Sequence, residues 1–84
     1  MSRSTLHVGN LPFDLSEDDL RQVFGDYGDV RAVRIVMDRD TGRPRGFAFV
    51  ELSSESQAQA AIEGLNQTQL GGRTMRVGIA RPKG

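Results

Sequence analysis

The sequence predicts one α+β domain whose elements follow in the order β-α-β-β-α-β. Its 84 residues suffice for a single domain and are too few for two. Strand-like segments, apolar at every second position, surround two segments whose apolar residues recur at the helical spacing i, i+3, i+4 and i+7. This order favours a four-stranded antiparallel sheet with both helices packed on one face, the ferredoxin-like fold. We expect one domain over residues 1–84, with its core between about residues 5 and 81 and short flexible termini.

Composition excludes several classes of protein. Apolar residues make up 37% and charged residues 26%, as in globular proteins, so disorder is not expected. The absence of cysteine excludes disulfides, thiolate nucleophiles and cysteine-ligated zinc. Apolar runs are far shorter than the roughly 20 residues that span a bilayer, and no signal peptide is recognisable. We expect a soluble monomer in the cytoplasm, or in the nucleus of a eukaryote, with no cofactor, metal or membrane contact.

The first strand is expected at Thr5–Gly9. Leu6 and Val8 share one face of it, and His7 lies on the other.

The first helix has a complete set of start signals. Ser16 is a good N-cap, and Asp19 stands where a capping box places its acid. Gly28 is the expected end of the helix. The apolar stripe that faces the core consists of Leu20, Val23, Phe24 and Tyr27.

Two strands joined by a polar loop are expected next. The segment 30–38 is rich in β-branched residues, but its alternation slips between Val30 and Val33, which indicates a bulge. Residues 38–44 contain glycine and proline and no apolar side chain other than the proline, so they form the loop. The following strand covers 46–52.

The second helix is expected from Ser54 to Leu65, with Gln57 as its capping-box partner. A turn at residues 70–72 then leads into a continuous last strand, Arg73 to Ala80, with Met75, Val77 and Ile79 on one face. The buried face of the sheet would be filled by Leu6, Val8, Ile35, Ala48, Val50, Met75 and Val77.

The third strand is apolar on both faces. Ala48, Val50 and Leu52 suit the crowded side under the helices, which leaves Phe47 and Phe49 exposed to water. An exposed apolar patch on a small domain usually marks an interaction site. Aromatic rings flanked by arginines suit unstacked nucleic acid bases, since every base offers a π-face and every nucleotide a phosphate.

Charge is unevenly distributed although the formal net charge is zero. Residues 14–29 hold six acids and one base, residues 31–45 hold five arginines and two aspartates, and residues 73–84 hold four bases and no acid. We therefore expect an acidic side on the first helix and a basic side elsewhere.

Two segments carry a resemblance to a known family. Residues 45–52, RGFAFVEL, match seven of the eight positions of the RNP1 octamer of RNA recognition motifs, with Leu52 in place of an aromatic residue. Residues 6–11, LHVGNL, resemble the RNP2 hexamer, with His7 where the family prefers Phe or Tyr. The resemblance extends from about Thr5 to Arg81. Leu52 changes packing, whereas His7 alters one of the family's three stacking positions.

The resemblance implies a module that binds single-stranded RNA, and in vitro also single-stranded DNA, in post-transcriptional regulation. Bases would stack on the RNP aromatic positions, arginines would meet phosphates, and backbone groups between Gly78 and Arg81 would read bases. The implied RNA-binding residues are His7, Asn10, Arg34, Arg45, Phe47, Phe49, Glu51, Arg76, Gly78, Ala80, Arg81 and Lys83, with Arg39 and Arg43 as loop contacts. Four of these are expected on the exposed face of the flanking strands, namely Arg34, Arg76, Gly78 and Ala80.

Other interpretations remain for the same features. The aromatic pair also suits a protein–protein interaction module or a homodimer contact, and the acidic first helix suits a basic protein partner. An enzyme of this fold would need a phosphate cradle or an oriented general base, and His7 on an open sheet has neither. We therefore predict no catalytic activity.

Overall fold

The computed structural model describes residues 4–12, 14–42 and 44–80, with the backbone alone described at 44 and 45. The elements are β1 (Thr5–Gly9), α1 (Glu17–Gly25), β2 (Val30–Met37), β3 (Pro44–Leu52), α2 (Glu55–Leu65), β4 (Gln69–Leu70), β5 (Arg73–Thr74) and β6 (Arg76–Ile79).

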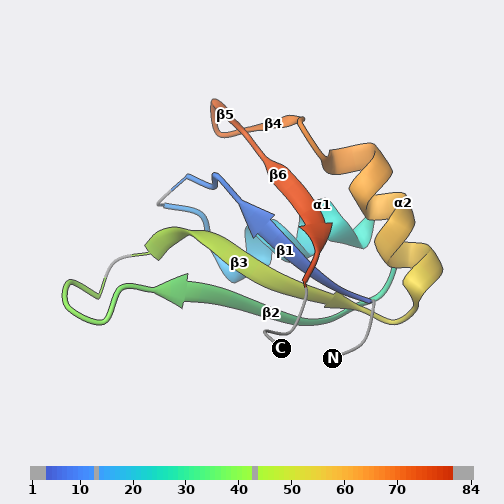
Figure 1. Ribbon diagram of the computed structural model, residues 1–84, viewed down its shortest axis with the longest axis horizontal. Coiled ribbons are helices and arrows are strands. Elements are labelled where there is room, and N and C mark those ends of the chain that lie inside the picture. Colours follow the sequence, from blue (N-terminus) through green and yellow to red (C-terminus); the bar gives the residue numbers. More distant parts are fainter. Residues whose placement is uncertain (1–3, 13, 43, 81–84) are drawn as a thin grey trace.

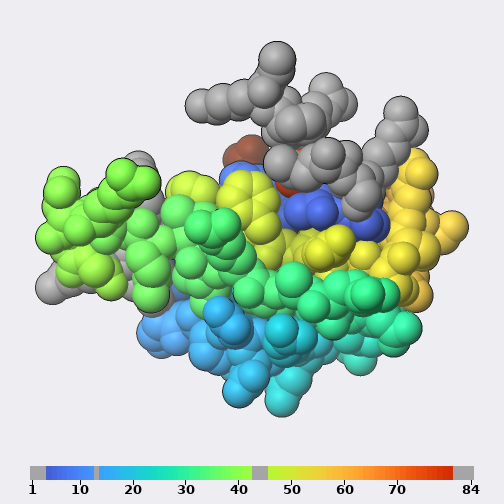
Figure 2. Space-filling view, turned by 90° about the horizontal axis from the view of Figure 1, so that it is seen from below, coloured from blue at the N-terminus to red at the C-terminus, as the bar shows by residue number. Residues whose placement is uncertain are grey.

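Four strands form one antiparallel sheet in the order β2-β3-β1-β6, and both helices lie on the same side of it (Figure 1). In Figure 2, α1 lies along one side of the sheet and atoms of β3 reach the opposite side. The predicted α+β fold, with two helices on one face, is confirmed. Within the described residues, no helix is long and apolar enough to cross a membrane.

One core joins the helices to the inner face of the sheet. Both helices contribute to the same buried cluster as the alternate residues of β1 and β3, and this is why the sheet has one dry face and one open face. Ile35, expected in this core, is only partly buried against it. The buried members are Leu6, Val8, Leu11, Leu20, Phe24, Ala48, Val50, Leu52, Ala58, Ala61, Met75 and Val77.

The start of α1 is as predicted, but its end is not. Ser16 Oγ accepts the Asp19 N–H at 3.2 Å, and the Asp19 carboxylate accepts the Ser16 N–H at 3.0 Å. The helix ends at Gly25, three residues before the predicted stop at Gly28. A Cβ at Gly28 would lie 2.4–2.6 Å from three atoms of Gln57, so this glycine permits a close approach between the α1–β2 loop and the first turn of α2 and does not cap the helix.

The side chain of Gln57 joins the α1–β2 loop to the residues that begin α2. Ser54 Oγ accepts the Gln57 N–H at 3.2 Å, as expected for the N-cap of α2. The reciprocal half of the predicted capping box is absent, because Gln57 Oε1 instead accepts the N–H of Asp29 at 3.0 Å and the N–H and hydroxyl of Ser53 at 3.2 and 2.7 Å. The side chain thus holds the α1–β2 loop against the start of α2.

The predicted last strand is split in two. Gly71 and Gly72 both have positive φ, which makes the tight hairpin between β4 and β5. Met75, almost fully buried, exchanges backbone hydrogen bonds with Gln67 and Thr68, so the chain pairs back on itself up to this point. Only from Arg76 onward does it pair with β1.

The bulge predicted early in β2 is confirmed. The register between β2 and β3 shifts between Val30 and Ala32, and again between Ile35 and Met37. The loop that follows projects beyond the body of the domain (Figure 1). Asp38 organises it, since Asp38 Oδ1 accepts the N–H groups of Asp40 and Thr41 at 2.8 and 3.3 Å.

Candidate nucleic-acid interface

The open face of the sheet is a grid of residues in register. In one row Arg34 of β2, Phe49 of β3, His7 of β1 and Gly78 of β6 lie side by side.

The neighbouring rows follow from the alternation of strand residues. One row holds Phe47, Gly9 and Arg76, because Phe47 lies two residues from Phe49 and Gly9 pairs with Arg76. The other row holds Ala32, Glu51 and Thr5.

Three rings gather at the centre of this grid. The His7 and Phe47 centroids are 5.4 Å apart with planes inclined by 31°, and His7 and Phe49 are 5.5 Å apart in an edge arrangement. Phe47 and Phe49 meet edge-on at 6.5 Å. His7 is exposed, whereas both phenylalanines are half-buried, because the rings of this aromatic cluster shield one another. Phe47 and Phe49 thus lie on the open face as expected, but they are less exposed than expected.

A groove of about 540 Å³ lies beside Phe49 on the β2 side of the aromatic cluster. Two exposed guanidinium-bearing residues, Arg34 and Arg39, stand along it, and Met37 is 53% exposed there. The groove therefore combines apolar surface with cationic groups at the edge of the ring cluster. Its lining consists of Arg34, Ile35, Val36, Met37, Arg39 and Phe49.

Among the described residues, β6 carries one cation on the open face, Arg76, and one position without a side chain, Gly78. Arg76 is exposed on the open face, opposite Gly9. Gly78 lies opposite His7 with no side chain. The prediction that Ala80 is also exposed is wrong, since it is 5% exposed. Ala80 lies just beyond β6, where its N–H donates to the Thr5 carbonyl at 2.9 Å. Its side chain is a single methyl group, and the paired backbone beside it covers most of the surface of that group.

The side chain of Asn10 makes hydrogen bonds within the domain. Its backbone is left-handed, with φ 59°. Its Nδ2 donates to the Thr74 carbonyl at 2.6 Å, and its Oδ1 accepts from Arg73 Nη2 at 2.8 Å. The side chain therefore ties the β4–β5 hairpin to the end of β1, and its predicted contact with RNA stays a prediction. Residues 10 and 73 are too far apart in sequence for their pairing to be read from the local pattern.

Glu51 is exposed in the row beyond His7 and Phe49, so the structure places it on the open face with the other predicted contacts. Arg43, Arg81 and Lys83, and the side chain of Arg45, lie outside the described residues.

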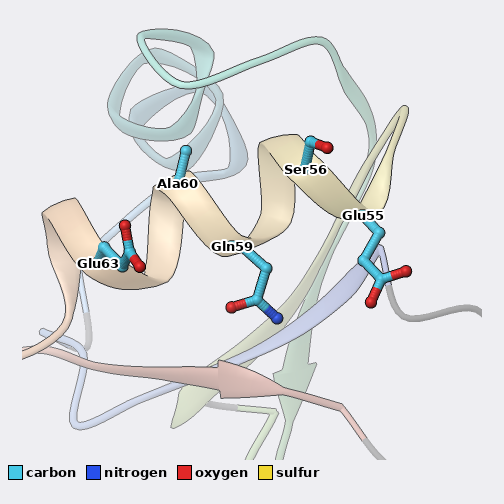
Figure 3. Close-up of a pocket in the computed structure, with 5 residues that line it drawn as sticks. All are labelled: Glu55, Ser56, Gln59, Ala60 and Glu63. Atoms are coloured by element: carbon cyan, nitrogen blue, oxygen red, sulfur yellow. The ribbon is translucent and has the colours of Figure 1, made fainter.

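The opposite side of the molecule differs in character. A second hollow runs along the outer side of α2, where Figure 3 shows its lining residues following one another along the helix. Acidic and amide side chains make up most of its lining, which consists of Glu55, Ser56, Gln59, Ala60 and Glu63. Among the described residues, no cluster of His, Asp or Glu side chains could hold a metal ion.

Comparison with known families identifies the family of this domain. Residues 6–76 match the RNA recognition motif family. The chain belongs to the RNA recognition motif family. This family comprises RNA-binding domains and not enzymes.

Relatives of this RNA recognition motif share the whole domain. This chain is 46% identical over 79 residues to RbpF of Nostoc sp. (strain PCC 7120), and the matched region covers 94% of this chain and 75% of that protein. It is 46% identical over 78 residues to the 28 kDa chloroplastic ribonucleoprotein of Spinacia oleracea, covering 93% of this chain and 34% of that one.

Solved structures share its fold closely. RNA binding protein PG1 superposes with a TM-score of 0.88 at 41% identity, covering 95% of this chain and 99% of that chain. The Rna15 RRM with bound RNA (GU) has a TM-score of 0.85 at 27% identity, and the match covers 96% of this chain and 86% of that chain. A Sxl-lethal protein/RNA complex has a TM-score of 0.87 at 39% identity, and the match covers 93% of this chain and 48% of that chain. Two of these three relatives thus carry RNA.

Proposed function

We propose that this domain binds single-stranded RNA across the open face of its sheet. The observation that carries the proposal is the aromatic cluster of His7, Phe47 and Phe49 on the face that the helices leave free. The ring surface that still faces solvent can be covered by a base, and each stacked base contributes about 1–3 kcal/mol. Membership of the family and the RNA-bound relatives support the same conclusion.

Arginines on the same face supply the contacts to phosphates. Arg34 and Arg76 stand on either side of the ring cluster, and Arg39 extends the cationic surface into the β2–β3 loop. Each phosphate that is neutralised contributes about 0.7 to the slope of log affinity against log salt for a single strand. With zero net charge, we expect a dissociation constant in the micromolar range or weaker, about −8 kcal/mol.

The biological role that fits such a module is post-transcriptional regulation of RNA in the cytoplasm, through a second copy, a partner protein or a long RNA that adds avidity. A basic protein partner would have its natural surface on α1, whose first turn presents Glu17, Asp18 and Asp19 to solvent.

A titration of labelled single-stranded RNA, followed by fluorescence anisotropy, tests the proposal. We expect saturable binding to mixed-sequence single strands, weaker or equal binding to single-stranded DNA, and no binding to a duplex, whose bases cannot reach the rings. Phe47→Ala should weaken the binding by about tenfold. An unchanged affinity in that variant, with the fold intact, would contradict the proposal and favour a surface for proteins.

A further inference from the structure

The surface beside His7 on the β6 side is bare backbone. His7 lies directly opposite Gly78 across the β1–β6 pair. Among the described residues other than its two chain neighbours, no heavy atom lies within 4 Å of the place that a Cβ of Gly78 would occupy, and its φ is not in the left-handed region. Next to the imidazole there is therefore a strip of open face whose floor is main chain alone.

His7 leaves this strip uncovered because its imidazole leans along β1 toward Gly9 and not across to Gly78. A Cβ on Gly9 would lie 3.6 Å from His7 Cε1, whereas no His7 atom comes within 4 Å of the same position at Gly78. The imidazole is also in contact with Phe47, with the ring centroids 5.4 Å apart and the planes tilted by 31°. Neighbouring strands lie about 4.8 Å apart, so the uncovered strip is about as wide as one aromatic ring.

Hydrogen-bonding groups line the outer rim of the strip. β6 is an edge strand. Ala80 N–H donates to Thr5 at 2.9 Å, and because bonded pairs alternate in antiparallel strands, His7 and Gly78 also form a bonded pair. The peptide groups of Val77 and Ile79 then point away from β1.

The hydrogen bond from the Val77 N–H to Asn66 Oδ1, at 3.0 Å, agrees with this direction. The N–H and C=O of Ile79 accordingly face outward beside Gly78, within reach of the edge of a base that lies over the strip.

We propose that Gly78 and His7 together form a subsite that prefers a purine. The inference rests on the proposed function, in which a base stacks on His7. A pyrimidine has one ring and covers the imidazole. The fused second ring of adenine or guanine also covers the backbone at Gly78 and brings its edge to the Ile79 peptide group. A side chain at residue 78 would occupy the place of that second ring.

The test compares three labelled oligonucleotides by fluorescence anisotropy: heptauridine, and the same oligomer with one central adenosine or one central cytidine. We expect the wild-type domain to bind the adenosine oligomer about fivefold more tightly than the other two. Gly78→Leu should remove this preference, so that the variant binds the three oligomers within about twofold of one another. The variant should fold, because the position is open and an apolar side chain suits a strand better than glycine.

Gly25→Leu is the matched control. Gly25 also has open space around it and an ordinary φ, but it lies at the end of α1, on the other side of the sheet. This variant should keep the preference for adenosine. Equal wild-type binding of all three oligomers, or a preference that survives Gly78→Leu, would overturn the purine subsite and leave RNA binding intact. No binding of any oligomer by the wild type would remove the proposed function itself and the inference with it.

Discussion

Replacing Phe49 with alanine removes the ring at the centre of the open face. Phe49 is in register with His7 on one side and Arg34 on the other, and it forms one wall of the groove beside β2. Its loss removes one stacking surface, worth about 1–3 kcal/mol. Since 1.4 kcal/mol is a factor of ten, we expect the affinity for single-stranded RNA to fall about 5- to 150-fold.

The effect on stability should be smaller than for a core residue. A fully buried phenylalanine loses about 3–5 kcal/mol when it is cut back to alanine, and the half-buried Phe49 should lose about half of that. Binding is therefore measured by anisotropy at low salt and at a temperature where circular dichroism shows every variant folded.

Tyr27→Ala provides the control for a lost aromatic ring. Tyr27 is also half-buried, but it packs against the core on the side of the helices. Its replacement should lower stability and leave the RNA affinity unchanged. The stacking argument fails if folded Phe49→Ala binds within twofold of the wild type, or if Tyr27→Ala loses as much affinity.

Three further variants test single contacts. Arg34→Gln should reduce the slope of log affinity against log salt by about 0.7. The control variant Arg21→Gln, on α1, should leave this slope unchanged. Equal slopes for the two variants would show that Arg34 does not contact a phosphate. Asn10→Ala should lower the free energy of unfolding by about 2 kcal/mol, through two lost hydrogen bonds and the left-handed backbone, as measured in urea. Asn10→Gly keeps the backbone freedom and should lose about 1 kcal/mol less; equal losses would show that backbone strain contributes nothing. Gly28→Ala should cost about 1–3 kcal/mol because a methyl group has no room there, whereas Gly25→Ala in open space should be neutral or stabilising; a neutral Gly28→Ala would contradict the tight loop contact.

Local pattern was sufficient to predict the parts of the fold that are locally determined. The period of two in residues 46–52 placed Ala48 and Val50 in the core and both phenylalanines on the opposite face, as observed. Ser16 and Asp19 predicted the first residue of α1 because a capping box involves only neighbours in sequence. The bulge in β2 was visible as a slip in its alternation.

Features that depend on distant contacts were missed. Gly28 was interpreted as a helix stop because its local sequence gives no sign of its contact with Gln57. That contact joins residues 29 positions apart, and the neighbouring hydrogen bond from the Asp29 N–H to Gln57 spans 28 positions. The hydrogen bond from Asn10 to Thr74 spans 64 positions. The apolar period from Met75 onward was read correctly, but it could not reveal that the chain first pairs with Thr68 and only then with β1.

The candidate site was predicted in outline and not in its surface detail. Sequence alone assigned the aromatic positions and the flanking arginines to the open face. It could not show that the rings shield one another, or that His7 leans toward Phe47 and leaves Gly78 bare. Ala80 was assigned by alternation to the exposed face, and only the position of the neighbouring backbone determines that its methyl group is covered.

The most direct test of the central claim is a titration of the ¹⁵N-labelled domain with short single-stranded RNA at low salt, followed in ¹H–¹⁵N correlation spectra. We expect the shift changes to concentrate on His7, on residues 46–51 and on residues 76–80, with Arg34 also affected and α1 and α2 largely unchanged. Changes confined to the helices, or no changes with any single-stranded RNA, would contradict the assignment of the open face as the RNA-binding surface.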